Sequence, residues 1–110
     1  FIMNSKESYE VILEQTKKDL SKVVDQKNIN KINISKLLKF SLQRQKNIIL
    51  YWVDSLNLNS PNSKVLDEIL RKFIFASKAK EPKLLWGTKN KKGSVSLRIK
   101  KGFLEAKPLT

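Results

Sequence analysis

Few residues of this chain are of the types that carry covalent catalysis. The 110-residue sequence contains no histidine and no cysteine, so it lacks the usual general base near neutral pH and any thiolate metal ligand. Its glycines, Gly87, Gly93 and Gly102, are isolated from one another and form no phosphate-binding loop. Asp67 and Glu68 are adjacent, but neighbouring side chains of a helix point about 100° apart. The sequence therefore predicts neither a catalytic site nor a metal site.

The chemistry that the residues do support is electrostatic. The chain has 23 Lys and Arg against 10 Asp and Glu, a net charge of +13. Residues 1–30 are net neutral, whereas the stretch from Lys78 to Lys101 holds nine bases and one acid, Glu81. A field of this kind attracts polyanions and accelerates their association. The charge therefore favours a nucleic-acid partner.

The same composition has a second explanation. Most of the basic residues are Lys, only three are Arg, and Asn and Ile are also abundant. An AT-rich genome produces this bias without any selection for binding, so the distribution of the charge matters more than its total.

The helices and strands that carry these bases are predicted from the periodicity of apolar residues. Apolar residues at helical spacing predict a first helix over residues 4–25 and a second over residues 39–57. Between them, Ile32 and Ile34 alternate with polar neighbours and predict a short strand, with a loop as the alternative. Ser60 as N-cap and Pro61 as first residue predict a third helix that runs to about Ser77.

Charge pairs are expected along the third helix. Asp67 precedes Arg71 by four residues and Glu68 precedes Lys72 by four, the favourable order for helical ion pairs. These bases are therefore weaker candidates for phosphate contacts than their charges suggest.

The C-terminal part loses the helical period. The stretch "SVSLRI" alternates, "KKG" predicts a tight turn, and "FLEA" follows as a second strand, a hairpin pattern. The expected fold is α+β, with about three helices, including a helical hairpin, beside a small antiparallel sheet. Trp52 and Trp86 lie in apolar runs, so core packing is favoured over stacking on bases.

One modest core suits this length. We expect residues 1–30 to be a helical lead-in and residues 31–110 to be the main domain of a fragment, since the chain starts with Phe1. No apolar run approaches the ~18 residues that suggest a membrane span, so no membrane partner and a cytoplasmic location are expected.

The middle of the chain resembles a known module. The stretch "LLKFSLQRQKNIILYWVDSLNLNSPNSKVLDEILRKFIFASKAKEPKLLWG" is similar to the substrate-binding domain of tRNA(Ile)-lysidine synthases. That module has a basic helix start leading to a Trp, a "P-S" helix opening, an "A-x-x-D-x-x-P" connection, a strand ending in "W-G" and an Arg-containing hairpin. The matching positions are Arg44, Leu50, Trp52, Val53, Pro61, Asn62, Ser63, Ala76, Ala79, Pro82, Trp86, Gly87 and Arg98.

The sequence departs from the family pattern at three points. The usual acid of the connection is Lys80 or Glu81 here, the "R-R-Y" of the hairpin is reduced to "RIK", and Asn62 replaces the small hydroxyl residue. These departures affect the transfer of individual site residues from the family more than they affect the assignment of the domain.

The resemblance implies a function. The family uses ATP to adenylylate cytidine 34 of the CAU-anticodon isoleucine tRNA, and free lysine then displaces AMP to give lysidine. The ATP site of the family is an "SGGxDS" loop in a separate catalytic domain, a motif that this chain lacks. ATP, Mg and lysine are thus expected only for that catalytic domain, and this chain is expected to hold tRNA(Ile) without a cofactor. A homodimer of the parent synthase is a further possibility.

Positioning a folded RNA needs backbone contacts spread over a surface. Arg44 is a candidate because it matches a basic position of the family. The other candidates are the bases of the C-terminal part: Lys78, Lys80, Lys83, Lys89, Lys91, Lys92, Arg98, Lys100 and Lys101.

A competing hypothesis is a structural or interaction domain that supports the catalytic domain or a dimer. It explains the charge by genome bias and predicts an exposed apolar patch that includes Phe40, Tyr51 and Phe75.

Overall fold

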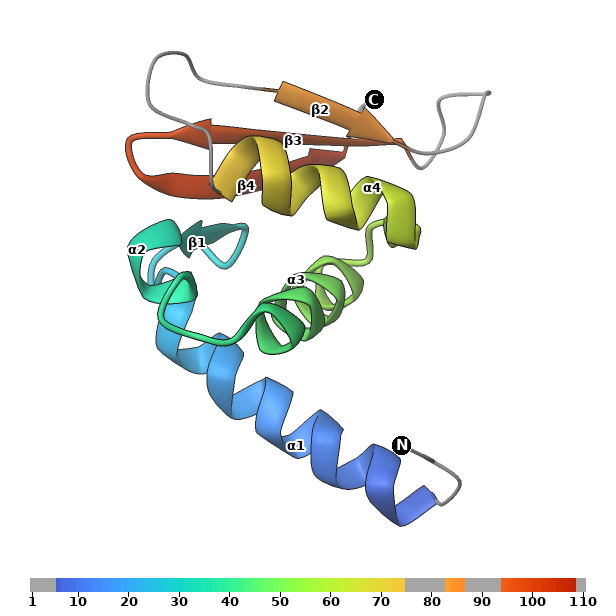
Figure 1. Ribbon diagram of the computed structural model, residues 1–110. Helices are drawn as coiled ribbons and strands as arrows, with labels where there is room; N and C mark the ends of the chain where they lie inside the picture. The colour runs from blue at the N-terminus through green and yellow to red at the C-terminus, as the bar shows by residue number, and fades with distance from the viewer. Residues whose placement is uncertain (1–5, 75–82, 87–93, 109–110) are drawn as a thin grey trace.

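Helices and one antiparallel sheet form the protein in the computed structural model, which describes residues 6–74, 83–86 and 94–108 (Figure 1). The helical part comprises α1 (Lys6–Val23), α2 (Ile34–Leu37), α3 (Leu42–Ser55), α4 (Ser63–Glu68) and a π-helical continuation, η1 (Ile69–Ile74). The strands are β1 (Lys31–Asn33), β2 (Lys83–Trp86), β3 (Val95–Lys100) and β4 (Phe103–Pro108). The expected α+β fold is confirmed.

The sheet has the order β1-β4-β3-β2, and all its neighbours are antiparallel. The predicted hairpin is the centre of this sheet. Lys101 and Gly102 join β3 to β4 with φ angles of 52° and 83°, the pair of left-handed residues that a tight hairpin turn requires. The predicted short strand is β1, which pairs with β4 at the edge. Local turn chemistry thus sets the register of the strands that carry the candidate bases.

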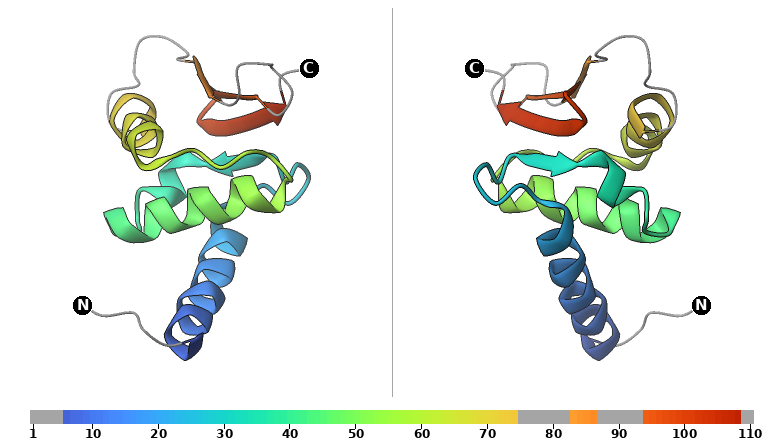
Figure 2. Two further views of the ribbon diagram at one scale, coloured as in Figure 1. Left: turned by 90° about the vertical axis from the view of Figure 1, so that its right-hand side faces the viewer. Right: turned by 90° about the vertical axis from the view of Figure 1, so that its left-hand side faces the viewer.

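The core lies between one face of the sheet and the helices α3 and α4 (Figures 1 and 2). The alternation expected for "SVSLRI" is confirmed, because Val95, Leu97 and Ile99 are buried in this core. Trp52 and Trp86 are buried too, and their indole N–H groups donate to the carbonyl oxygens of Ile29 at 2.7 Å and Asn59 at 2.8 Å. Core packing of both tryptophans is confirmed, and neither indole is available to stack on a base.

The break between α3 and α4 has a specific backbone geometry. Asn57 has φ 60°, its N–H donates to Asp54, and the N–H of Leu58 donates to Val53, so α3 ends in a Schellman motif. Helix α4 starts later than predicted. Its N-cap is Asn62, whose side chain accepts from the N–H of Val65 at 2.9 Å, so Ser60 as cap and Pro61 as first helical residue were wrong. Helix α4 therefore begins where a side chain accepts a hydrogen bond from one of the free backbone N–H groups of the first turn.

The predicted partner of Asp67 differs in the structure, whereas the predicted end of the third helix and the side chain of Lys72, the predicted partner of Glu68, lie outside the described residues. The structure describes this helix to Ile74, and the expected end near Ser77 lies outside the described residues. Asp67 pairs with Lys46 of α3 at 3.3 Å, not with Arg71 as predicted. This contact joins two helices, which local spacing cannot foresee.

Helix α1 packs along only part of its length. Its second half joins the core at Val23, and Thr16 is also buried. Its first half projects from the body of the molecule (Figure 2), and Tyr9 and Ile12 are 63% and 38% exposed. The apolar stripe predicted for this helix is therefore split into a packed half and an exposed half.

Candidate nucleic-acid interface

The ten predicted contact residues fall into three groups. Five of them, Lys78, Lys80, Lys89, Lys91 and Lys92, lie outside the described residues. The backbone of Lys83 starts β2 and pairs with Arg98. The remaining four, Arg44, Arg98, Lys100 and Lys101, have described side chains, and the structure brings three of them together at the β3–β4 hairpin.

Arg98 lies at the centre of a cationic cluster on the sheet face that points away from the core. Its Nε donates to Oε1 of Glu105 on β4 at 2.7 Å. The Nζ atoms of Lys31 on β1 and Lys107 on β4 lie 3.8 Å and 3.9 Å from the same carboxylate. Three cations therefore share one anion, and the cluster keeps an excess of positive charge.

The Glu105 side chain is only 6% exposed, although it belongs to the outer face. Burial alone would raise the pKa of Glu105, but the hydrogen bond from Arg98 and the charges of Lys107, Arg98 and Lys31 leave that pKa below its usual value. The carboxylate stays ionised and holds the cations in place. A bound phosphate would meet a preorganised group of donors.

Strand pairing extends this cluster across the sheet. Lys31, Glu105 and Arg98 form one row across β1, β4 and β3, and Asn33, Phe103 and Lys100 form the next row. Side chains of residues two apart share a face, so both rows lie on the outer face. We define the basic sheet face by its charged members: Lys31, Arg98, Lys100, Glu105 and Lys107.

Two members of the basic sheet face were missed from the sequence. Lys107 follows "FLEA" with the alternation expected of the outer face, a signal that was present in the sequence. Lys31 joins only because β1 pairs with β4, more than 70 residues away along the chain. Tertiary pairing was needed to find it.

Lys100 and Lys101 lie at the end of the hairpin and are both exposed. The turn is held in place, because Gly102 accepts a hydrogen bond from the N–H of Ile34 at the start of α2, at 3.1 Å. The two lysines thus present their charges from a fixed backbone.

Arg44 lies elsewhere and has a structural partner. Its Nε and Nη2 atoms donate to the two carboxylate oxygens of Asp19 on α1, at 2.9 Å and 2.7 Å. Its guanidinium also lies over the ring of Phe40, 5.0 Å from the centroid. The Arg44 side chain is 44% exposed and that of Asp19 is 2% exposed. This bidentate pair ties α3 to α1, and the role of Arg44 in RNA binding remains a prediction.

The pair makes stability depend on pH. The hydrogen bond from Arg44 lowers the pKa of Asp19, against the opposing effect of burial. A lowered folded-state pKa contributes stability that is complete above the unfolded value of about 3.9 and is lost as the pH falls through the folded value. We expect Asp19→Asn to lower the melting temperature by about 5 °C at pH 7 and by progressively less as the pH falls below about 3.9.

Thermal unfolding followed by circular dichroism measures this difference. Glu14→Gln is the control, since Glu14 forms an exposed ion pair with Lys17 at 3.5 Å on the same helix. Equal effects of the two substitutions at pH 7 would contradict the special role of Asp19.

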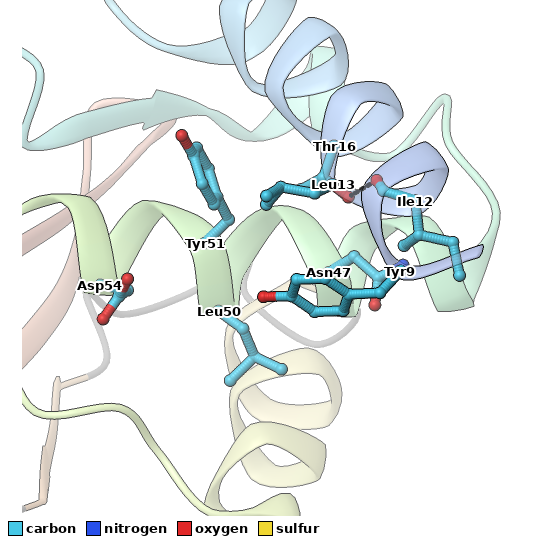
Figure 3. A pocket seen from close by; sticks show the side chains of 8 residues that line it. All are labelled: Tyr9, Ile12, Leu13, Thr16, Asn47, Leu50, Tyr51 and Asp54. Carbon is cyan, nitrogen blue, oxygen red and sulfur yellow. Dashed lines mark hydrogen bonds between the residues drawn. The ribbon is translucent and has the colours of Figure 1, made fainter. Parts of the chain in front are cut away.

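A groove between α1 and α3 has a different character (Figure 3). It encloses about 280 Å³, and its walls carry Tyr9 and Ile12 of α1 opposite Leu50 and Tyr51 of α3. Its lining includes the carboxylate of Asp54 and no base. A groove that is apolar and acidic does not suit a phosphate backbone.

The apolar patch that the competing hypothesis predicts is not found as expected among the described residues. Phe40 is half-buried beneath Arg44, Tyr51 is half-buried in the groove wall, and Phe75 lies outside the described residues. Among the described residues, large exposed apolar side chains lie instead on the first half of α1, at Tyr9, Val11 and Ile12, and at the separate positions Ile29, Leu38 and Leu42. In the part of the chain that the structure describes, no helix is long and apolar enough to cross a membrane.

Comparison with known proteins places the chain in a family. A family model described as "TilS substrate binding domain" matches residues 32–104, which run from β1 to β4 and cover more than half of the chain. No curated protein and no solved structure matches the chain significantly. The matched range contains Arg98, Lys100 and Lys101 of the hairpin, and the chain belongs to the TilS substrate-binding domain family.

Proposed function

We propose that this domain binds the body of tRNA(Ile) as the substrate-binding part of a tRNA(Ile)-lysidine synthase. Family membership gives the chain a role in substrate binding in tRNA-lysidine synthases. The observation that supports RNA as the substrate is the basic sheet face, where Lys31, Arg98 and Lys107 surround the carboxylate of Glu105. Phosphate contacts of this kind fix the register and orientation of a nucleic acid without reading bases.

The proposed reaction takes place outside this chain. In it, AMP would be transferred from ATP to cytidine 34 of the tRNA with release of pyrophosphate, and lysine would then displace AMP to form lysidine. The residues of this chain bind and orient the RNA and take no part in the bond changes. A rigid cationic sheet suits this task, because A-form RNA is recognised mainly by shape and by contacts to its phosphates and 2′-hydroxyls.

Binding to RNA across a salt series tests the proposal. The chain is titrated with the CAU-anticodon isoleucine tRNA and, in parallel, with an elongator methionine tRNA. Steep salt dependence with preference for the isoleucine tRNA identifies a specificity module, and steep dependence without preference identifies a grip on the tRNA body. An absence of binding at low salt overturns the proposal.

That last outcome would favour a second candidate function, contact with another protein. The exposed apolar residues of α1 and the groove beside α3 support it, since large exposed apolar patches often mark protein interfaces. The catalytic domain of the synthase and a second copy of this chain are its two candidate partners.

The segment between β2 and β3 supplies a separate prediction. Lys89, Lys91 and Lys92 lie outside the described residues and were chosen from the sequence. We expect their combined replacement by Glu to weaken tRNA binding about 10-fold or more at 0.1 M salt and to lower the salt slope. Unchanged binding of this variant in the same titration would remove the segment from the interface.

A further inference from the structure

The basic sheet face ends at a small polar cavity of about 140 Å³. The cavity is enclosed by the end of α1, the β1–α2 junction and the first residue of β4. Its charged lining residues are Lys22, Lys36 and Asp25, and Asn33 and Phe103 form part of its wall. Asn33 and Phe103 also belong to the row that contains Lys100, so the cavity continues the basic sheet face.

We propose that this cavity seats one phosphate group of the bound RNA, with Lys22 and Lys36 as its cationic ligands. The inference rests on the proposed RNA binding and adds to it a site that sequence reasoning did not predict. Lys22 was assigned to the helical lead-in, outside the basic C-terminal part, and Lys36 lies in a four-residue helix between two longer ones. Only the folded chain brings them to one cavity.

Backbone hydrogen bonds hold the walls of the cavity in place. The N–H of Asp25 donates to the carbonyl of Lys31 at 2.9 Å and fixes the end of α1 beside β1. The Asn33 side chain accepts from the N–H of Lys36 at 3.0 Å and caps α2. The bond from Ile34 to Gly102 fixes the hairpin turn beside them. The ligand-bearing segments are therefore positioned before any RNA arrives, which lowers the entropic cost of binding.

The charges around the cavity favour an anion. Lys22 and Lys36 are both exposed, so their ammonium groups can turn toward a ligand. Each ammonium group has three donors, and charge-assisted hydrogen bonds to phosphate are the strong ones. Asp25 opposes them, and its carboxylate accepts from the N–H of Lys27 at 3.5 Å. Two cations against one anion leave the site net positive, and removing the anion should tighten binding.

Paired variants with matched charge test the site. Lys22→Ala with Lys36→Ala removes two charges at the cavity, and Lys17→Ala with Lys18→Ala removes two charges from the exposed surface of α1. We expect the cavity pair to weaken binding of the CAU-anticodon isoleucine tRNA about 10-fold at 0.1 M salt and to lower the salt slope by about one. The control pair should change affinity less than 2-fold. Equal effects of the two pairs, or no effect of either, would overturn the site.

The Asp25→Asn variant is expected to gain affinity for tRNA, a result that misfolding of the variant could not produce. We expect this variant to bind the tRNA about 3-fold tighter, and unchanged or weaker binding would count against the site.

Titration with inorganic phosphate, followed by NMR of the backbone amides of Val24, Asp25 and Phe103, separates the possible failures. Shifts at these amides without any RNA binding would show that the cavity binds free phosphate. That result would contradict the proposal that the bound phosphate belongs to an RNA. RNA binding that is insensitive to the cavity pair would overturn the site and leave the proposed function standing. Neither shifts nor RNA binding would overturn both.

Discussion

Replacement of Lys100 and Lys101 by Glu is expected to weaken tRNA binding about 100-fold at 0.1 M salt and to lower the salt slope by about two. Both side chains are exposed at the end of the hairpin, next to the cluster of Lys31, Arg98 and Lys107. Reversal of their charge places two anions where phosphates would approach. The fold should tolerate both changes, because both side chains are exposed and neither makes a contact with the core.

Filter binding or fluorescence anisotropy with labelled tRNA measures this effect. Lys17→Glu with Lys18→Glu is the matched control, since it makes the same change in net charge on the first helix. If the control lost affinity as strongly as the hairpin variant, net charge alone would drive binding and the basic sheet face would have no special role.

Trp52→Ala is expected to destabilise the domain by about 3–5 kcal/mol, the range for a large aromatic residue removed from a core. Trp52 is fully buried in α3, and its indole N–H donates to the carbonyl of Ile29 in the loop before β1. The substitution leaves a cavity and also removes the hydrogen-bond donor of the Ile29 carbonyl. For a domain of this size the loss approaches the whole free energy of folding.

Trp52→Phe separates the two contributions, because it keeps most of the apolar volume and removes only the hydrogen bond. We expect it to cost about 1–2 kcal/mol. Urea unfolding at constant pH measures both variants, and an unchanged m-value confirms that the same surface unfolds. A cost below 1 kcal/mol for Trp52→Ala would contradict the burial of this side chain.

The two faces of the molecule differ in the partners that they suit. The outer sheet face carries a surplus of cations held by Glu105, whereas the groove of α1 and α3 is apolar with an acidic rim. RNA on the sheet and a protein in the groove would not compete for the same surface.

Short-range patterns in the sequence were enough to predict the longer helices, the hairpin and their local chemistry. Alternation placed Val95, Leu97 and Ile99 in the core, and the Lys101-Gly102 turn was readable because only a few residue types adopt two successive positive φ angles. The order of motifs around Trp52 and Trp86 pointed to the TilS family, and the family model matches that region. These features are encoded within short windows of the chain.

The contacts between charged side chains could not be predicted in this way, because they join elements that are distant in the sequence. Lys31 reaches Glu105 through strand pairing across more than 70 residues, and Arg44 is held by Asp19 from another helix. Lys46 pairs with Asp67 across α3 and α4, where helical spacing had favoured Arg71. The physical reason is the same in each case. Periodicity fixes which face of an element a residue occupies, but the partner of a charged side chain depends on how separate elements pack, and that is set by the whole core.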